Sequence, residues 1–452
     1  MFMEQLNNFI DSVYHIVWGI PLLALLFGTG AYLTVILKGV QFRYLGYAVK
    51  QVFAKQKKDS EGDISHFEAL MTSLAGAIGT GTIVGVATAI TIGGLGALFW
   101  MWIMAFLGMA TKYAESLLAV KYRELDAKGE MIGGPMQYIE RGLGWKWMAS
   151  LFAIFGAIAA LGTGNLAQVN SIAAAAGELW NVNPWATGVA LSILTALVIM
   201  GGVKSIGHVA GILVPIMAIF YILGGLVIIA IHFDRLPEAF MQIFHSAFHG
   251  QAAIGGFAGS TVMMAVQIGV ARSIFSNEAG LGISSMAAAA AITDSPGRQA
   301  MITMTGALLS TVIVCTITGL VLAVTGVFGA TESGEVVTGV VLAMRAFETI
   351  PWGIYIVSIG LVLFAFSTVI AWAYYGEKCC EYLFGVRSIM VYRLIYCLAV
   401  IPGAALQIKV VWGLSDIMNG LMVIPNLIAL LALSKSITSE TNLFLASIKN
   451  EA

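Results

Sequence analysis

Charged residues are scarce in this chain of 452 residues. Lys, Arg, Asp and Glu make up 10% of it, whereas a soluble domain carries roughly 25%. Hydrophobic residues make up 59%, and the mean hydropathy is +0.90. So few charges exclude an ordinary soluble domain, and the net charge of −1 gives no basis for a nucleic-acid partner. The composition indicates an integral membrane protein.

Cysteine is also rare, and the four cysteines have neither the spacing of a zinc site nor that of a disulfide framework. All of them fall in or at the inner ends of apolar runs, so we expect buried thiols that behave as small hydrophobic side chains. The six histidines fall in loops or at the ends of such runs. No run carries a His/Glu metal constellation, a Ser/Lys pair or paired carboxylates, so we expect neither an enzyme nor a bound cofactor.

Long apolar runs recur along the whole chain, and each can cross a bilayer core of about 30 Å. The first run follows Glu4 and Asp11 rather than a basic segment, so we expect no cleavable signal peptide. The sequence therefore predicts an all-α membrane protein with about eleven transmembrane helices. The predicted spans are 14–37, 67–91, 95–119, 148–176, 185–203, 208–232, 254–290 (interrupted), 299–328, 351–383, 389–407 and 411–433. The seventh and ninth are too long for simple crossings.

Lysine and arginine are distributed unevenly between the ends of these spans. Of the 23 such residues, only Arg235, Arg345 and Lys409 lie at one set of ends, and Arg272 lies inside a span. The others lie at the opposite ends, many of them in the segments 36–66 and 112–146. Because an excess of Lys and Arg marks the cytoplasmic side, we expect the N-terminus outside and the C-terminus in the cytoplasm.

Two spans are interrupted by residues that disfavour a helix. Residues 75–85 contain four glycines, and each costs about 1 kcal/mol relative to alanine in a helix interior. Residues 275–282 (FSNEAGLG) interrupt a span in the other half of the chain. Paired interruptions of this kind are typical of the binding site of a secondary transporter. The alternative is that glycines such as Gly81 and Gly85 only let helices pack closely.

The placement of the two interruptions predicts an inverted repeat. When the first span is set aside, they fall in the first and the sixth of ten spans, and five crossings reverse the orientation of the second half. We therefore expect a five-plus-five inverted repeat with two discontinuous helices and one extra N-terminal helix. The corresponding division is 1–66 for the extra helix and its loop, 67–232 and 254–433 for the repeats, and 434–452 for a cytoplasmic tail.

Polar residues within the spans are candidates to complete a site between the half-helices. Free N–H groups at a half-helix N-terminus bind a carboxylate, and opened carbonyls together with hydroxyls bind a hard cation. Gln168 shares a helix face with Asn165 and Ser171, and we favour a functional role for Gln168 over interhelical packing. Ser367 and Thr368 form a plausible cation site, and Trp372 lies on the same face as Thr368 and could line the cavity.

Arg272 and Glu278 flank the second interruption. A charge at that depth is costly unless it is paired or near a mouth of the site. We expect both to be structural or gating charges rather than substrate ligands.

The chain resembles the alanine/glycine:cation symporters, which are prokaryotic relatives of the amino acid–polyamine–organocation transporters. The resemblance covers nearly the whole length. Its motifs are 62–67 (GDISHF), 78–81 (IGTG), 99–102 (FWMW), 108–115 (GMATKYAE), 129–131 (GEM), 133–136 (GGPM), 275–282, 296–300 (PGRQA) and 374–379 (YYGEKC).

This resemblance implies symport of a small neutral amino acid, alanine or glycine, with sodium or a proton across a prokaryotic inner membrane. It also implies the residues of the site. Around the substrate we expect Ala77, Thr80, Gly81, Gln168, Phe275, Ser276 and Asn277, with Trp372 as a wall. Around the cation we expect the carbonyls of Ala75 and Ile78 and the hydroxyls of Ser367 and Thr368.

One position departs from the family pattern, since Thr82 stands where the family has asparagine. The number of coupled ions and the substrate preference are therefore open. The alternatives are a glutamine/sodium symporter of the same family, a proton-coupled carrier and, less favoured, an ion channel. D-alanine is a further candidate substrate, and the stereoselectivity and the oligomeric state are also open.

Overall fold

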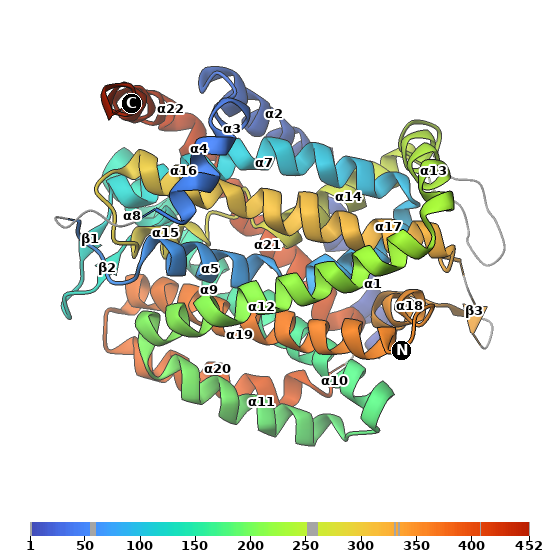
Figure 1. Cartoon of the computed structure of the whole chain (residues 1–452). Helices are drawn as coiled ribbons and strands as arrows, with labels where there is room; N and C mark the ends of the chain where they lie inside the picture. Colours follow the sequence, from blue (N-terminus) through green and yellow to red (C-terminus); the bar gives the residue numbers. More distant parts are fainter. Residues whose placement is uncertain are drawn as a thin grey trace.

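The computed structural model describes residues 2–54, 60–250, 261–329, 331–332, 335–406 and 408–451, and it is almost entirely helical (Figure 1). Among these described residues, seven helices are long and apolar enough to cross a membrane, and a bent pair of helices makes an eighth candidate span. Two shorter apolar helices, α11 and α20, and the interrupted segment of α14 and α15 lie where the sequence predicts the remaining spans. The first residues of the predicted span 254–290, up to 260, lie outside the described residues.

The N-terminal part comes before the repeats. It consists of α1 (Phe2–Val17), α2 (Ile20–Ile36), α3 (Val40–Arg43) and α4 (Leu45–Val52). Helices α1 and α2 together form one candidate span, and they pack against α21 and α7 respectively.

The spans of the two halves follow in order. In the first half they are α5 (His66–Ala77) with η1 (Gly81–Gly85) and α6 (Val86–Gly93), then α7 (Gly96–Lys121), α9 (Lys146–Ala159) with η2 (Ala160–Leu166) and α10 (Ala167–Trp180), α11 (Pro184–Ile199) and α12 (Gly202–Ile231). In the second half they are α14 (Val262–Asn277) with α15 (Ser285–Ala289), then α16 (Pro296–Ala307) with η4 (Leu308–Cys315) and α17 (Thr316–Thr325), α19 (Gly353–Phe384), α20 (Ser388–Gly403) and α21 (Ile408–Ala432).

Shorter elements cover the two ends of the bundle. One end carries β1 (Glu124–Leu125), β2 (Met131–Ile132) and α8 (Pro135–Leu143), and α22 (Ser434–Glu451) lies beside it (Figure 1). The other end carries η3 (Phe233–Arg235), α13 (Leu236–His249), β3 (Thr331–Glu332), β4 (Glu335–Val336) and α18 (Gly339–Phe347). The strands form two antiparallel hairpins, in which Glu124 pairs with Ile132 and Thr331 with Val336.

Helix α19 is a single continuous helix of 32 residues. At 1.5 Å per residue it is about 48 Å long, which exceeds the bilayer core of about 30 Å. The sequence predicts that this span is too long for a simple crossing. The observed helix agrees, because a helix of this length must tilt or extend beyond the core.

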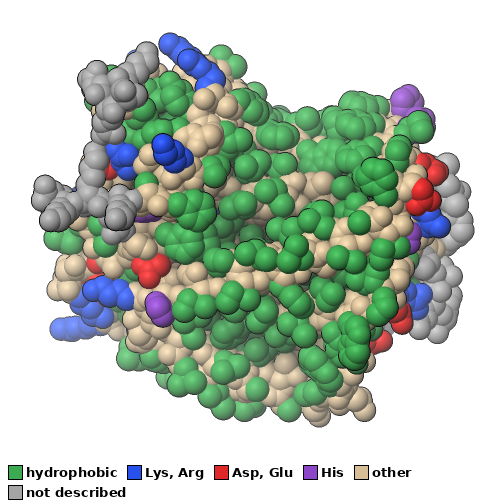
Figure 2. Space-filling view, in the orientation of Figure 1, with side chains coloured by type: hydrophobic (Ala, Val, Ile, Leu, Met, Phe, Trp, Pro, Cys, Tyr) green, Lys and Arg blue, Asp and Glu red, His purple; other side chains and the backbone are tan. Residues whose placement is uncertain are grey.

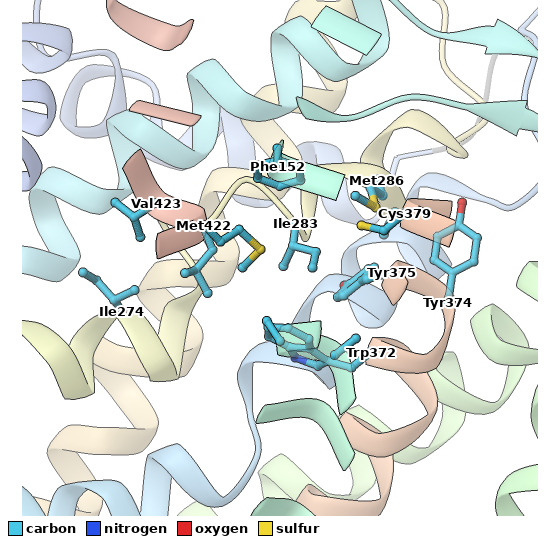
Figure 3. Close-up of a cluster of buried hydrophobic side chains, with 14 of the residues drawn as sticks. Phe152, Ile274, Ile283, Met286, Trp372, Tyr374, Tyr375, Cys379, Met422 and Val423 are labelled. Carbon is cyan, nitrogen blue, oxygen red and sulfur yellow. The ribbon is translucent and has the colours of Figure 1, made fainter. Parts of the chain in front are cut away.

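The apolar side chains divide between the bilayer and the interior. Green side chains cover the middle of the surface in Figure 2, and charged groups gather toward its two ends. Helix α12, for example, exposes Ile212, Ile216, Ile219 and Leu223. Inside, Phe152, Met286, Trp372 and Met422 from four different elements meet in one cluster (Figure 3). Helices of both halves thus share one core around the interrupted segments.

Candidate substrate and cation site

The first interruption is a short break between α5 and η1. Helix α5 starts with a capping box in which the Ser65 hydroxyl accepts from the backbone N–H of Glu68, and it ends at Ala77. Ile78 leaves the helical conformation with ψ of 75°, and the chain is bent by 50° before it resumes at Gly81. The predicted opening of 75–85 is therefore too long. Gly85 is not part of the opened segment. It lies in the π-helical turn Gly81–Gly85, and a π-helical turn accommodates more residues than an α-helical turn without breaking the helix.

Gln168 joins this break to the next span. Its Oε1 accepts a hydrogen bond from the backbone N–H of Thr80 at 3.0 Å, and its Nε2 donates to the carbonyl of Thr163 at 2.9 Å. Gln168 is fully buried, so both ends of its amide are used inside the protein. The break thus has one of its freed N–H groups satisfied by a neutral side chain, whereas the buried Thr80 hydroxyl has no partner among the described residues.

The predicted hydroxyl pair lies against the end of α5. Thr368 donates to the carbonyl of Ala75 at 2.8 Å, and Ser367 lies 3.5 Å from the same oxygen. Both hydroxyls also bond back to the carbonyl of Phe364 one turn earlier, as Ser and Thr commonly do in helices. Their oxygens and the Ala75 carbonyl therefore form a compact group of hard ligands, which suits a small cation such as sodium.

Trp372 closes the same side of the break. Its indole N–H donates to the carbonyl of Gly76 at 3.3 Å, and its ring packs against Gly164 of η2. A Cβ added at Gly164 would lie 2.9 Å from Cδ2 of Trp372. The tryptophan thus forms a wall between η2 and the end of α5.

Phe275 covers the first break from α14. A Cβ added at Gly81 would lie 3.1 Å from Cε1 of Phe275 and 3.3 Å from its carbonyl oxygen. The Phe275 ring stacks on Trp412, with centroids 5.0 Å apart, and the guanidinium of Arg272 lies over both rings. Arg272 forms a buried ion pair with Asp416. Of the two alternatives for Arg272, a pairing or a place near a mouth of the site, the structure shows the pairing, and its partner comes from α21.

The second interruption runs from Glu278 to Ser284, between α14 and α15. Asn277 accepts from the backbone N–H of Ala279 at 2.9 Å, and its carbonyl accepts from the Lys112 ammonium at 2.8 Å. Glu115 accepts from the backbone N–H of Gly280 at 2.9 Å and from the amide of Asn426 at 2.7 Å. Lys112, Glu115 and Glu278 are all fully buried. This break is therefore held by charged groups from α7.

Ser276 precedes this break and points to another span. Its hydroxyl lies 2.7 Å from that of Thr311 in η4 and donates to the carbonyl of Ser273 at 2.9 Å.

The end of the bundle with α8 is closed by loops from both halves. Arg123 donates to the carbonyls of Glu61 and Ala291 at 2.9 and 2.8 Å, and so links the segment before α5 to the segment after α15. Asp63 accepts from the backbone N–H of Met131 at 2.7 Å. Partial burial raises the pKa of Asp63 and lowers that of Arg123. These bonds explain why the polar motif at 62–67 precedes an apolar span.

Several of the predicted residues meet around the first break. Ala75, Ser367 and Thr368 come together, as do Gly81 and Phe275. The side chain of Ile78 lines an apolar pocket between α4, α5, α12 and η4, whereas the prediction for this residue concerns its carbonyl. The Thr82 hydroxyl donates to the carbonyl of Gly79 at 2.8 Å.

Sequence reasoning placed Lys112 in a cytoplasmic segment, which is wrong, because this lysine is fully buried inside α7. It also missed Glu115, Trp412, Asp416 and Asn426, whose partners are far away along the chain. A signal was present for the first of these, since Lys112 and Glu115 lie at i, i+3 near the end of an apolar run.

Two discontinuous helices from opposite halves, facing each other at mid-bundle with hydroxyls and opened peptide groups between them, define a secondary transporter with an inverted repeat. Solved structures share this fold. The crystal structure of MhsT in complex with L-phenylalanine covers 85% of this chain and 99% of its own, with a TM-score of 0.59 and 15% identity. A manganese transporter of Eremococcus coleocola covers 85% of this chain and 83% of its own, with a TM-score of 0.52 and 16% identity. At these identities the likeness concerns the fold alone.

The chain belongs to the sodium:alanine symporter family, whose profile matches residues 3–452. It is 52% identical to the sodium/alanine symporter AgcS of Methanococcus maripaludis, over 98% of each chain. It is also 35% identical to the probable sodium/glutamine symporter GlnT of Bacillus subtilis, over 96% of this chain and 90% of the relative. The chain is thus a multi-pass membrane transporter and not an enzyme.

Proposed function

We propose that this protein is a symporter that imports alanine and glycine together with sodium by alternating access. The single observation that carries the proposal is the arrangement at the first break. The Ala75 carbonyl, Ser367 and Thr368 gather hard oxygen ligands at the end of α5, and Gly81 lies directly beneath Phe275. A cation and a small zwitterion would thus bind beside the same half-helix, which couples them.

The crowding at Gly81 favours a small side chain on the substrate. Glutamine is the second candidate, since a family member 35% identical bears the name of a glutamine symporter. Phe275 lies in van der Waals contact above Gly81, so a long amide side chain would require this ring to move. We therefore assign the small amino acids first.

The site roles are part of the same proposal. Thr80, Gly81, Ala77 and Gln168 would surround the substrate from the first half, and Phe275, Ser276 and Asn277 from the second, with Trp372 as a wall. The cation would lie between Ala75, Ile78, Ser367 and Thr368, with the main-chain oxygen of Ile78 as its contribution. Thr82 uses its hydroxyl within the break, which favours a single sodium at these ligands.

The topology is proposed on the charge distribution. The end that carries α8 and Arg123 would face the cytoplasm, with the N-terminus outside and the C-terminus inside a prokaryotic inner membrane. The repeats would comprise 67–232 and 254–433.

Uptake of labelled alanine into proteoliposomes, under separately imposed sodium and proton gradients, tests the proposal. We expect saturable uptake that follows the sodium gradient and is inhibited by excess glycine. Uptake that follows only the proton gradient would remove sodium coupling, and glutamine uptake that excess alanine leaves unchanged would remove the small-substrate assignment.

A further inference from the structure

Glu278 ends α14 in a conformation that a glutamate rarely adopts. Its φ is 59°, in the left-handed region, where the position after a helix is usually glycine or asparagine. Strained backbone of this kind persists where the surroundings over-determine it, and it clusters at functional sites. The side chain is also fully buried. The presence of a carboxyl group here, in place of a glycine, is therefore the feature to explain.

Few donors face this carboxyl group. Neither of its oxygens has a hydrogen-bond partner within the described part of the chain. The side chains of Lys112, Trp372 and Ser284 face it, and the Trp372 N–H is already directed to the Gly76 carbonyl. Gly76 itself lies directly against it, since a Cβ added there would be 2.8 Å from Oε1 of Glu278 and 3.0 Å from Cε2 of Tyr375.

The charges around Glu278 do not balance if every group is ionised. Lys112 is the one cation that faces both Glu278 and Glu115 among the described residues. Glu115 accepts two hydrogen bonds on Oε1, from Gly280 and Asn426, and such bonds favour the ionised form of a carboxylate. One ammonium and two carboxylates would leave an uncompensated negative charge in a low-dielectric interior, which is costly. A bound cation must therefore neutralise this negative charge.

A proton fits this position better than a metal ion. Hard metal cations need a shell of several oxygen ligands. Among the described residues, the side chains that face Glu278 include the indole of Trp372, the ring of Tyr375, the ammonium of Lys112 and the hydroxyl of Ser284, which together offer few oxygen ligands. A proton needs only one carboxylate oxygen.

We propose that Glu278 is a proton-binding site, protonated while α5 lies against it and ionised when α5 moves away and admits water. The group is attached to the second break but touches Gly76 of the first, one residue from the carbonyl in the cation site. Movement of α5 would thus change the solvation of the carboxyl group and the cation ligands together. This coupling rests on the proposed function, because it assumes that α5 moves during transport.

Infrared difference spectroscopy of the purified protein tests the protonation state without transport. We expect the C=O stretch of a protonated, buried carboxyl group in the wild type at neutral pH and its loss in Glu278→Gln. In Glu278→Asp, which keeps the number of carboxyl groups around Lys112, the band should shift in frequency, and the matched control Glu115→Asp should leave its frequency unchanged. A band that survives in Glu278→Gln, or that shifts only in Glu115→Asp, would overturn the assignment. If Glu278→Gln does not fold, Glu278→Asp serves instead, and the band must shift in frequency.

Calorimetry of sodium-dependent alanine binding tests the coupling. Bound alanine would hold α5 against Glu278, whereas the free protein would lose the proton as the pH rises. In buffers of different ionisation enthalpy, we therefore expect little proton uptake on binding near a pH of about 6 and an uptake that approaches about one per alanine toward a pH of about 9. Glu278→Gln should bind alanine with no proton uptake. Wild-type binding without proton exchange over this range would overturn the coupling. A wild type that binds no alanine would instead refute the proposed function, while the infrared result would still decide the state of Glu278.

Discussion

The two breaks solve the same structural problem with different chemistry. In the first break the freed peptide groups meet neutral partners, namely Gln168, Thr368 and Trp372. In the second they meet the ionisable groups Lys112 and Glu115 together with Asn426. The first break is also shorter, since its backbone leaves the helix only between Ala77 and Gly81.

The two breaks therefore differ in how easily a ligand can replace the hydrogen-bond partners of their peptide groups. Neutral hydrogen bonds contribute roughly 0.5–1.5 kcal/mol each, so a substrate or cation can replace them at little cost. Bonds to buried charged groups are harder to give up, because the charge that remains is unpaired. We infer that the first break exchanges ligands and that the second holds its shape through the network from α7.

The largest effect is expected at the contact between the breaks. Gly81→Leu places a side chain where the Phe275 ring lies, so uptake of alanine should fall by about 100-fold or more, to background, while membrane insertion is retained. The control is Gly85→Ala, whose Cβ would lie at an ordinary 3.5 Å from Cδ of Arg272 and should be tolerated. Normal uptake by Gly81→Leu would show that the breaks do not enclose the substrate.

The next effect concerns anchorage of the second break. Glu115→Ala leaves the Asn426 amide and the Gly280 N–H without this acceptor and removes a negative charge that faces Lys112, so the free energy of unfolding should fall by about 3–5 kcal/mol. A large drop of the melting temperature in detergent would report it. Glu238→Ala, at an exposed position of α13, is the control and should melt like the wild type. Identical melting of the two variants would contradict the anchoring role.

A smaller effect is expected from the cation ligands of the first break. In the double variant Ser367→Ala and Thr368→Ala, the sodium concentration for half-maximal uptake should rise about tenfold, because two oxygen ligands are lost. The maximal rate should change less. Ser358→Ala removes a buried hydroxyl from the same helix more than two turns away and should leave sodium dependence unchanged. Unaltered sodium dependence in the double variant would show that the cation binds elsewhere.

The smallest effect is expected at Gln168. Replacement by alanine frees the Thr80 N–H and loosens the break, so the alanine concentration for half-maximal uptake should rise about fivefold. Gln168→Glu keeps an acceptor for this N–H but places an unpaired carboxylate against the Thr163 carbonyl at a fully buried position, so it should impair uptake more than alanine does. The hypothesis fails if the two variants cannot be distinguished in concentration dependence.

The same comparison explains how far the sequence predicts this protein. The number of spans and the place of both breaks follow from apolar length and glycine clusters, which act locally. The partners of the second break do not, because Asn426 lies 146 residues beyond the carbonyl of Gly280 to which it donates. The length of the first break was overestimated, since glycine permits a distortion but does not fix how far it extends.

The π-helical segment η2 determines which way Gln168 faces. The side-chain amide of Gln168 donates to the carbonyl of Thr163, five residues earlier, across the widened turn of η2. Each residue of an α-helix rotates the next by about 100°, so deletion of one residue from η2 would swing Gln168 away from Thr80. In a relative whose corresponding turn is a regular α-helix, the residue at the same sequence offset would therefore lie on another face of the helix.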